Sequence, residues 1–164
     1  MFTIDKTVPI NADLKPGDPI LTRDQIWEGL LMKAYDAKPF VRLMTKCGVT
    51  REFENGIERR IVFRGMELTE RLTFYPKTKV EFVRTKGIEM GTITNEIVED
   101  QTGALCLRFA FSLERSDMEP GSAEETEFAA GYAQGYLVSV QKTIDTIREL
   151  VRAGKLNIPD SARA

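Results

Sequence analysis

The sequence predicts an α+β fold in which seven strands form an antiparallel sheet and one long C-terminal helix covers it. Three observations support this prediction. Apolar residues alternate with a period of two from Cys47 to Glu114, the period of half-buried strands. From Phe128 to Val151 they recur with the helical period. The links between the predicted strands are short, which favours antiparallel pairing. One apolar helix face must therefore cover one apolar sheet face.

The N-terminal part is predicted to contain one strand and two short helices. Phe2–Val8 has the composition of a strand, and the Pro- and Gly-containing stretch Asn11–Ile20 predicts a loop. Thr22 and Gln25 form a capping box that starts a helix. A second short helix is expected over Pro39–Thr45, because proline suits the first turn of a helix.

Six strands follow without interruption. Asn55-Gly56, a strong hairpin signal, joins the first two of them. The predicted strands are Cys47–Glu54, Ile57–Arg64, Leu68–Tyr75, Val80–Lys86, Met90–Val98 and Leu105–Leu113.

The C-terminal helix is predicted to begin after Ser122 and to end near Ala153. Ser122 and Glu125 form a second capping box. The apolar stripe of this helix consists of Phe128, Tyr132, Tyr136, Val140, Ile144, Ile147 and Val151. We expect residues 1–155 to form a single domain, followed by a loosely held tail over residues 156–164.

Composition excludes several classes of function. The chain of 164 residues contains no histidine, so mechanisms that need an imidazole base or ligand are ruled out. Its two cysteines, Cys47 and Cys106, form no CxxC pair, and no metal site is expected. The net charge of −2 gives no general field for nucleic acid. No glycine-rich nucleotide motif is present, so no cofactor is predicted.

The same reasoning bears on location. No segment approaches 18 consecutive apolar residues, so no membrane span is predicted. The N-terminus lacks the apolar run of a signal peptide. We therefore expect a cytoplasmic protein. The sequence does not decide between a monomer and a homo-oligomer.

Five polar residues fall on strand faces that are otherwise apolar, and these are the candidates for chemistry. Strand alternation turns Glu70, Asn95, Arg59, Arg84 and Arg51 towards the interior. Buried polar groups on neighbouring strands indicate either a paired network or a polar-lined pocket. Arg51 is the weakest candidate because it lies near an exposed hairpin.

Each candidate has a functional and a structural interpretation. Glu70 is either a carboxyl whose pKa is raised by an apolar cavity, suited to acid or base catalysis, or the partner of Arg59 or Arg84 in a buried ion pair. Asn95 and Arg59 are candidate donors to a developing oxyanion. Arg84 is either a further donor or a strand-end side chain that turns to solvent.

Aromatic and aliphatic residues supply candidate cavity walls. Tyr132 and Tyr136 lie one helical turn apart on the face that meets the sheet, where their rings either pack or present a hydroxyl to a ligand. The other candidate wall residues are Phe128, Phe82, Ile93, Phe109, Phe111 and Leu72.

Three segments carry a resemblance to a known family: Leu21–Leu30 (LTRDQIWEGL), Glu70–Pro76 (ERLTFYP) and Thr94–Ile97 (TNEI). With the order of elements, they resemble the START-related, birch-pollen-allergen-like superfamily (SRPBCC), and within it the AtaL-like branch. The resemblance implies a helix-grip fold, with seven antiparallel strands around the long helix and an internal cavity. It departs from the plant allergens at the glycine-rich loop, which here is the tight turn Phe53–Ile57.

The resemblance also implies a function. Members of the superfamily bind hydrophobic or aromatic small molecules, and some catalyse cyclisation, aromatisation or dehydration. We therefore expect a hydrophobic or aromatic ligand in the cavity. The leading hypothesis is a cofactor-free cyclisation, dehydration or isomerisation in specialised, polyketide-like metabolism, with Glu70, Arg59 and Asn95 as catalytic residues. The alternatives are a non-catalytic carrier and a protein-interaction module.

Overall fold

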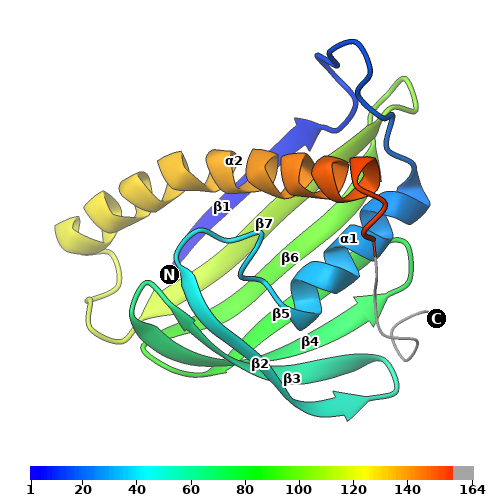
Figure 1. The fold of residues 1–164 in the computed structure, drawn as a ribbon. Coiled ribbons are helices and arrows are strands. Elements are labelled where there is room, and N and C mark those ends of the chain that lie inside the picture. The colour runs from blue at the N-terminus through cyan, green and yellow to red at the C-terminus, as the bar shows by residue number, and fades with distance from the viewer. Residues whose placement is uncertain (157–164) are drawn as a thin grey trace.

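A computed structural model describes residues 1–156, and its elements are those of an α+β fold (Figure 1). The predicted tail over residues 156–164 lies outside this description except for its first residue. In chain order the elements are β1 (Phe2–Pro9), α1 (Arg23–Tyr35), β2 (Met44–Phe53), β3 (Gly56–Phe63), β4 (Met66–Tyr75), β5 (Lys79–Lys86), β6 (Glu89–Glu99), β7 (Leu105–Arg115) and α2 (Ala123–Arg152).

The seven strands form one antiparallel sheet with the order β1-β7-β6-β5-β4-β3-β2. Six strands follow one another as hairpins, and β1 adds to the free edge of β7. The sheet is strongly curved, and α2 crosses its concave side, as Figure 1 shows. The α+β prediction and the helix-grip architecture are confirmed.

The core forms where the C-terminal half of α2 meets α1 and the sheet. Val140, Ile144 and Ile147 of α2 are almost fully buried there. Gly29 lies at the contact between the two helices, because a Cβ built on it would be 2.4 Å from Cγ1 of Ile147. The approach of α1 to α2 therefore depends on the absence of a side chain at position 29.

The prediction of a second short helix over Pro39–Thr45 is wrong. Between β1 and β2, α1 is the only α-helix in the described part of the chain. Residues 37–44 instead form tight turns, in which the amides of Phe40 and Val41 both donate to the carbonyl of Ala37. A helix through Thr45 would compete with strand pairing, since Met44 already belongs to β2 and lies opposite Phe63 of β3. Tertiary pairing decides the conformation here.

The prediction that Arg51 faces the interior is also wrong. The pairing of β2 with β3 is irregular between Val49 and Arg51, where an extra residue interrupts the alternation. Arg51 consequently lies on the exposed face, with its guanidinium carbon 5.0 Å from the centre of the Phe53 ring. Across residues 1–156, neither helix has the length and apolarity needed to cross a membrane.

Candidate functional site

A cavity of about 460 Å³ lies between the concave face of the sheet, α1 and the middle of α2. Its volume is within the range of small-molecule sites, about 300–1,000 Å³. Strands β3 to β7 supply its floor, the turns before β2 supply one side, and α2 supplies residues between Gly131 and Thr143. Glu70 and Asn95 both line it, which is the arrangement that a ligand-binding function requires.

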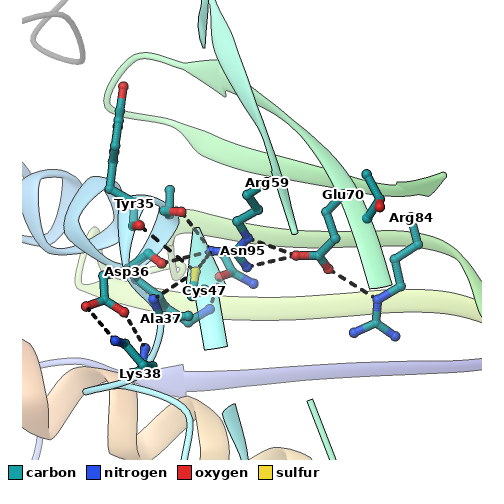
Figure 2. Close-up of polar contacts among 12 residues, drawn as sticks. Tyr35, Asp36, Ala37, Lys38, Cys47, Arg59, Glu70, Arg84 and Asn95 are labelled. Atoms are coloured by element: carbon teal, nitrogen blue, oxygen red, sulfur yellow. Dashed lines mark hydrogen bonds and ion pairs between the residues drawn. The ribbon is translucent and has the colours of Figure 1, made fainter. Parts of the chain in front are cut away.

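A row of buried charges crosses the cavity floor (Figure 2). Arg59, Glu70 and Arg84 lie opposite one another on β3, β4 and β5. Arg59 Nε donates to Glu70 Oε1 at 2.9 Å, and Arg84 Nε donates to Glu70 Oε2 at 3.2 Å. All three side chains are at most 5% exposed. The carboxylate therefore bridges two guanidinium groups, as in the ion-pair interpretation of Glu70.

This pairing determines the ionisation of Glu70. Burial alone would raise the pKa of its carboxyl, but the charges and hydrogen bonds of Arg59 and Arg84 outweigh burial, and the net pKa is lowered. Glu70 is therefore an anion at neutral pH. The raised pKa expected of a general acid is not found.

Arg59 is held mainly by the protein itself. Its Nη1 donates to the backbone carbonyls of Lys33 at 3.1 Å and Ala34 at 2.7 Å, at the C-terminal end of α1. The same nitrogen lies 3.6 Å from Cys47 Sγ. Arg59 thus ties α1 to the sheet, and most of its N–H groups are already used.

Lys33 is a residue that the sequence analysis missed. It lies on α1 and is 7% exposed, and Nζ donates to Asn95 Oδ1 at 2.7 Å. Nζ also lies 4.8 Å from the centre of the Phe109 ring and 5.3 Å from that of Phe82. Burial, reinforced by the positive charge of Arg59, lowers the pKa of Lys33 to about 7, although Glu70 and Cys47 oppose this. The signal was available, because position 33 is seven residues after Ile26 on the buried face of α1.

Glu89 is the second missed residue. It is fully buried at the start of β6, on the same face as Ile93 and Asn95. Its Oε1 accepts hydrogen bonds from Arg84 Nη1 and, at 3.2 Å, from Tyr132 Oη. Its Oε2 is buried and accepts no hydrogen bond within residues 1–156. The alternation of β6 would have indicated Glu89 if the predicted strand had begun one residue earlier.

The two tyrosines on α2 form part of an aromatic cluster. The Phe111 ring centre lies 5.0 Å from that of Tyr132 and 4.5 Å from that of Tyr136. Burial raises the pKa of Tyr132 to about 12, although the charge of Arg84 opposes this. Burial also raises the pKa of Tyr136 well above its ordinary value. Both hydroxyls are therefore protonated at neutral pH and can act as hydrogen-bond donors.

The structure brings most of the candidate residues to the cavity. Nine of them line it: Arg59, Glu70, Phe82, Arg84, Ile93, Asn95, Phe109, Tyr132 and Tyr136. Besides Arg51, three others do not. Leu72 is fully buried in the main core, and Phe111 and Phe128 pack with Phe2 beside the cavity.

The lining is strongly basic although the chain carries a net charge of −2. Six basic residues line the cavity (Lys33, Arg42, Arg59, Arg64, Arg84 and Lys142), and Glu70 is the acidic one. Arg42, Arg64 and Lys142 are exposed, so they form the mouth. In residues 1–156, no cluster of carboxylates and thiols has an arrangement that could hold a metal ion.

Comparison with solved structures shows the same fold in proteins of low sequence identity. The Zhui aromatase/cyclase from Streptomyces sp. R1128 superimposes with a TM-score of 0.66 at 15% identity, over 93% of this chain and 97% of that one. A START superfamily protein from Mycobacterium smegmatis superimposes with a TM-score of 0.58 at 14% identity, over 91% and 98%.

Comparison of sequences identifies the family. Acetylaranotin biosynthesis cluster protein L of Aspergillus terreus is 26% identical over 152 residues, which cover 90% of this chain and 88% of that protein. The model of the family described by that name, AtaL, matches residues 4–154. The match begins within β1 and spans the other six strands and both helices, so the chain belongs to the AtaL family.

Proposed function

We propose that this protein binds a hydrophobic or aromatic small molecule in the cavity and catalyses a cofactor-free cyclisation, dehydration or isomerisation of it. The observation that carries the proposal is the cavity itself, in which Phe82, Ile93 and Phe109 face a few converging polar groups. Apolar walls with a small number of fixed polar groups are typical of sites that orient one substrate. The name of the Aspergillus relative, a biosynthesis cluster protein, supports a role in specialised metabolism.

The polar groups have different roles in this proposal. Arg59 and Glu70 mainly fix the geometry, because their charges satisfy one another. Asn95 accepts from Lys33 with Oδ1, which leaves its two N–H donors for a ligand oxygen. Arg84 lines the cavity between Glu70 and Tyr132, where its positive charge would stabilise an oxyanion that develops on the ligand. Preorganised donors of this kind stabilise charge that develops during reaction.

The basic lining defines the ligand further. An excess of fixed positive charge around an apolar cavity favours a ligand that carries a carboxylate, phenolate or enolate. An enolate is also the anion that forms when a proton leaves a carbon next to a carbonyl. The positive charge of the lining would therefore favour both the binding of an anionic ligand and the formation of an enolate.

The proposal is tested by ligand capture followed by turnover. The protein is isolated under native conditions and denatured, and the released small molecules are identified by mass spectrometry. Binding is measured independently with 8-anilinonaphthalene-1-sulfonate, an anionic aromatic probe. The released molecule is then supplied to the protein, and its conversion is compared with that in protein-free buffer.

Three outcomes separate the hypotheses. Conversion to a rearranged product supports an enzyme. Tight binding without any change in the product distribution indicates a carrier and overturns the catalytic part. The absence of both a released molecule and probe binding overturns the whole proposal.

A further inference from the structure

The amine of Lys33 is placed to react with a ligand. It lines the cavity, and its one hydrogen bond in the described part of the chain goes to the neutral amide of Asn95. The carboxylate that shares the cavity, Glu70, already bridges Arg59 and Arg84. An ammonium group has three N–H donors, and only one of them has a hydrogen-bond partner in residues 1–156. Since that partner is a neutral amide, no carboxylate pairs directly with a positive charge at Nζ there.

The surroundings of Lys33 favour the neutral amine. Arg59 on β3 repels a positive charge at Nζ, while Glu70 on β4 and Cys47 on β2 favour one more weakly. Burial has the largest effect, and together with the charge of Arg59 it lowers the pKa of Lys33 to about 7. At pH 7 about half of such an amine is neutral, against roughly one part in 2,500 for a lysine with the ordinary value of 10.4.

We propose that Lys33 is a nucleophile that forms an imine with an aldehyde or ketone carbonyl of the ligand in the cavity. The inference rests on the proposed function, which places that ligand, and adds the chemical class of the substrate and the residue that activates it. A neutral lysine in an apolar pocket beside another cationic group is a recognised form of activated nucleophile.

The step is balanced without any cofactor. The nitrogen lone pair attacks the carbonyl carbon and the C–N bond forms. The carbonyl oxygen then leaves as water with the two hydrogens of the amine, and a C=N bond remains. Protonation of the imine draws electrons from the neighbouring carbon and makes its C–H bond more acidic. Carbon–carbon cyclisation and dehydration both begin from that activated carbon, and hydrolysis by one water returns the amine.

The test uses 4-carboxybenzaldehyde, an aromatic aldehyde whose carboxylate suits the basic lining. The intact chain is incubated with the probe and sodium cyanoborohydride at pH 7, digested and mapped by mass spectrometry. We expect Lys33 to gain the mass of the probe less one oxygen atom, the mass of a reduced imine. Modification at Lys33 should exceed that at exposed lysines roughly tenfold or more, because more of its amine is neutral.

Two variants provide controls. Lys33→Met should lose the modification, while Lys46→Met, which changes an exposed lysine on β2, should keep it. The pH dependence is measured without a reductant, using 2,4,6-trinitrobenzenesulfonate, an anionic aromatic reagent that reacts with the neutral amine. Its rate at Lys33 should rise between pH 6 and 8 and then level off, whereas its rate at ordinary lysines should continue to rise above pH 9. Exclusive modification of Lys142 at the cavity mouth, or of surface lysines, overturns the proposal.

The failure of this proposal can be distinguished from that of the proposed function. The non-carbonyl compound 4-methylbenzoate has a similar shape but cannot form an imine. If the aldehyde and this analogue both displace anilinonaphthalene sulfonate and Lys33 stays unmodified, the cavity binds ligands and the imine is excluded. If the sulfonate itself does not bind, the ligand site fails and the imine fails with it.

Discussion

Arg59 Nε donates to Glu70 Oε1 at 2.9 Å from the directly opposite position on the neighbouring strand. Both groups are buried, and Arg84 contacts the second oxygen of the same carboxylate. Glu70 therefore bridges two guanidinium groups beneath the ligand cavity, and Glu89 supplies the second negative charge to Arg84. A substitution that removes the carboxylate of Glu70 therefore alters the charge of the cavity floor as well as its hydrogen bonds.

The Glu70→Gln variant should be much less stable than the original protein. It removes the anion between two buried cations, and breaking a buried pair on one side costs about 3–5 kcal/mol. Urea unfolding measures the loss. Asp5→Asn is the matched control, because Asp5 forms an exposed pair with Arg108 and its loss should cost about 1 kcal/mol or less. Equal losses in the two variants would contradict the importance of the buried row.

Lys33→Met should change how stability depends on pH. The pKa of Lys33 is lowered to about 7 in the folded protein, so between pH 7 and 10 the unfolded chain binds more protons at this residue. Its contribution to stability therefore rises with pH in that window and is least favourable below pH 7. The free energy of unfolding of the variant minus that of the original protein should be about 2–3 kcal/mol more positive at pH 6 than at pH 9. Urea unfolding at the two pH values measures this, and Lys46→Met should show no such trend.

Gly29→Ala should destabilise the packing of α1 on α2. The added methyl group would overlap Ile147, and overpacking of a filled core costs about 1–3 kcal/mol. Gly135→Ala is the comparison within α2, since a Cβ there meets nothing within 4 Å. That variant should be neutral or more stable by up to about 1 kcal/mol, because alanine is the better helix former. Thermal unfolding of both variants distinguishes crowding from helix propensity.

Gly131→Phe should hinder the entry of ligands while the fold remains intact. Gly131 lines the cavity on α2, and the space around its missing side chain is open. A phenyl ring there should reduce the affinity for anilinonaphthalene sulfonate several-fold, with an unchanged melting temperature. Gln134→Phe places the same ring on an exposed position of the same helix and should leave binding unchanged. Unaltered binding in Gly131→Phe would show that ligands enter elsewhere.

The basic mouth should make binding of anionic ligands sensitive to salt. Arg64 is exposed, and its guanidinium carbon lies 5.0 Å from the centre of the Tyr132 ring. Arg64→Gln should weaken binding of the anionic sulfonate probe and reduce its dependence on salt, because exposed charges are screened by added ions. The uncharged probe N-phenyl-1-naphthylamine should respond little. Arg60→Gln, on the exposed side of β3, is the control for a general change of charge.

Local patterns in the sequence predict most of the fold. Strand alternation places Glu70, Arg59 and Asn95 on the inner face, because the other inward positions of their strands are mostly apolar. The same rule fails for Arg51, since an irregular pairing in β2 is a property of two strands together. The turns around Phe40 follow from strand pairing in the same way.

The site is less predictable than the fold. Lys33 belongs to a helix, and a long basic side chain on a helix ordinarily reaches solvent. Helical spacing from Ile26 places Lys33 on the buried face of α1, but its contacts with Asn95, Phe82 and Phe109 depend on how that helix meets the sheet. The ionisation of Glu70 likewise depends on its contacts with both Arg59 and Arg84, and strand alternation places these side chains on one face without giving the distances between their charged groups.

The buried row of Arg59, Glu70 and Arg84 also has a consequence for folding. Their three strands are joined by short hairpins, in which a slip of one residue would turn a side chain to the opposite face. If β4 slipped in this way, Glu70 would face solvent, Arg59 would lose the one carboxylate that it contacts in residues 1–156, and Arg84 would keep only Glu89. That misfolded hairpin would carry a heavy electrostatic penalty. The charged side chains beneath the cavity therefore favour the native alignment of these three strands over alignments shifted by one residue.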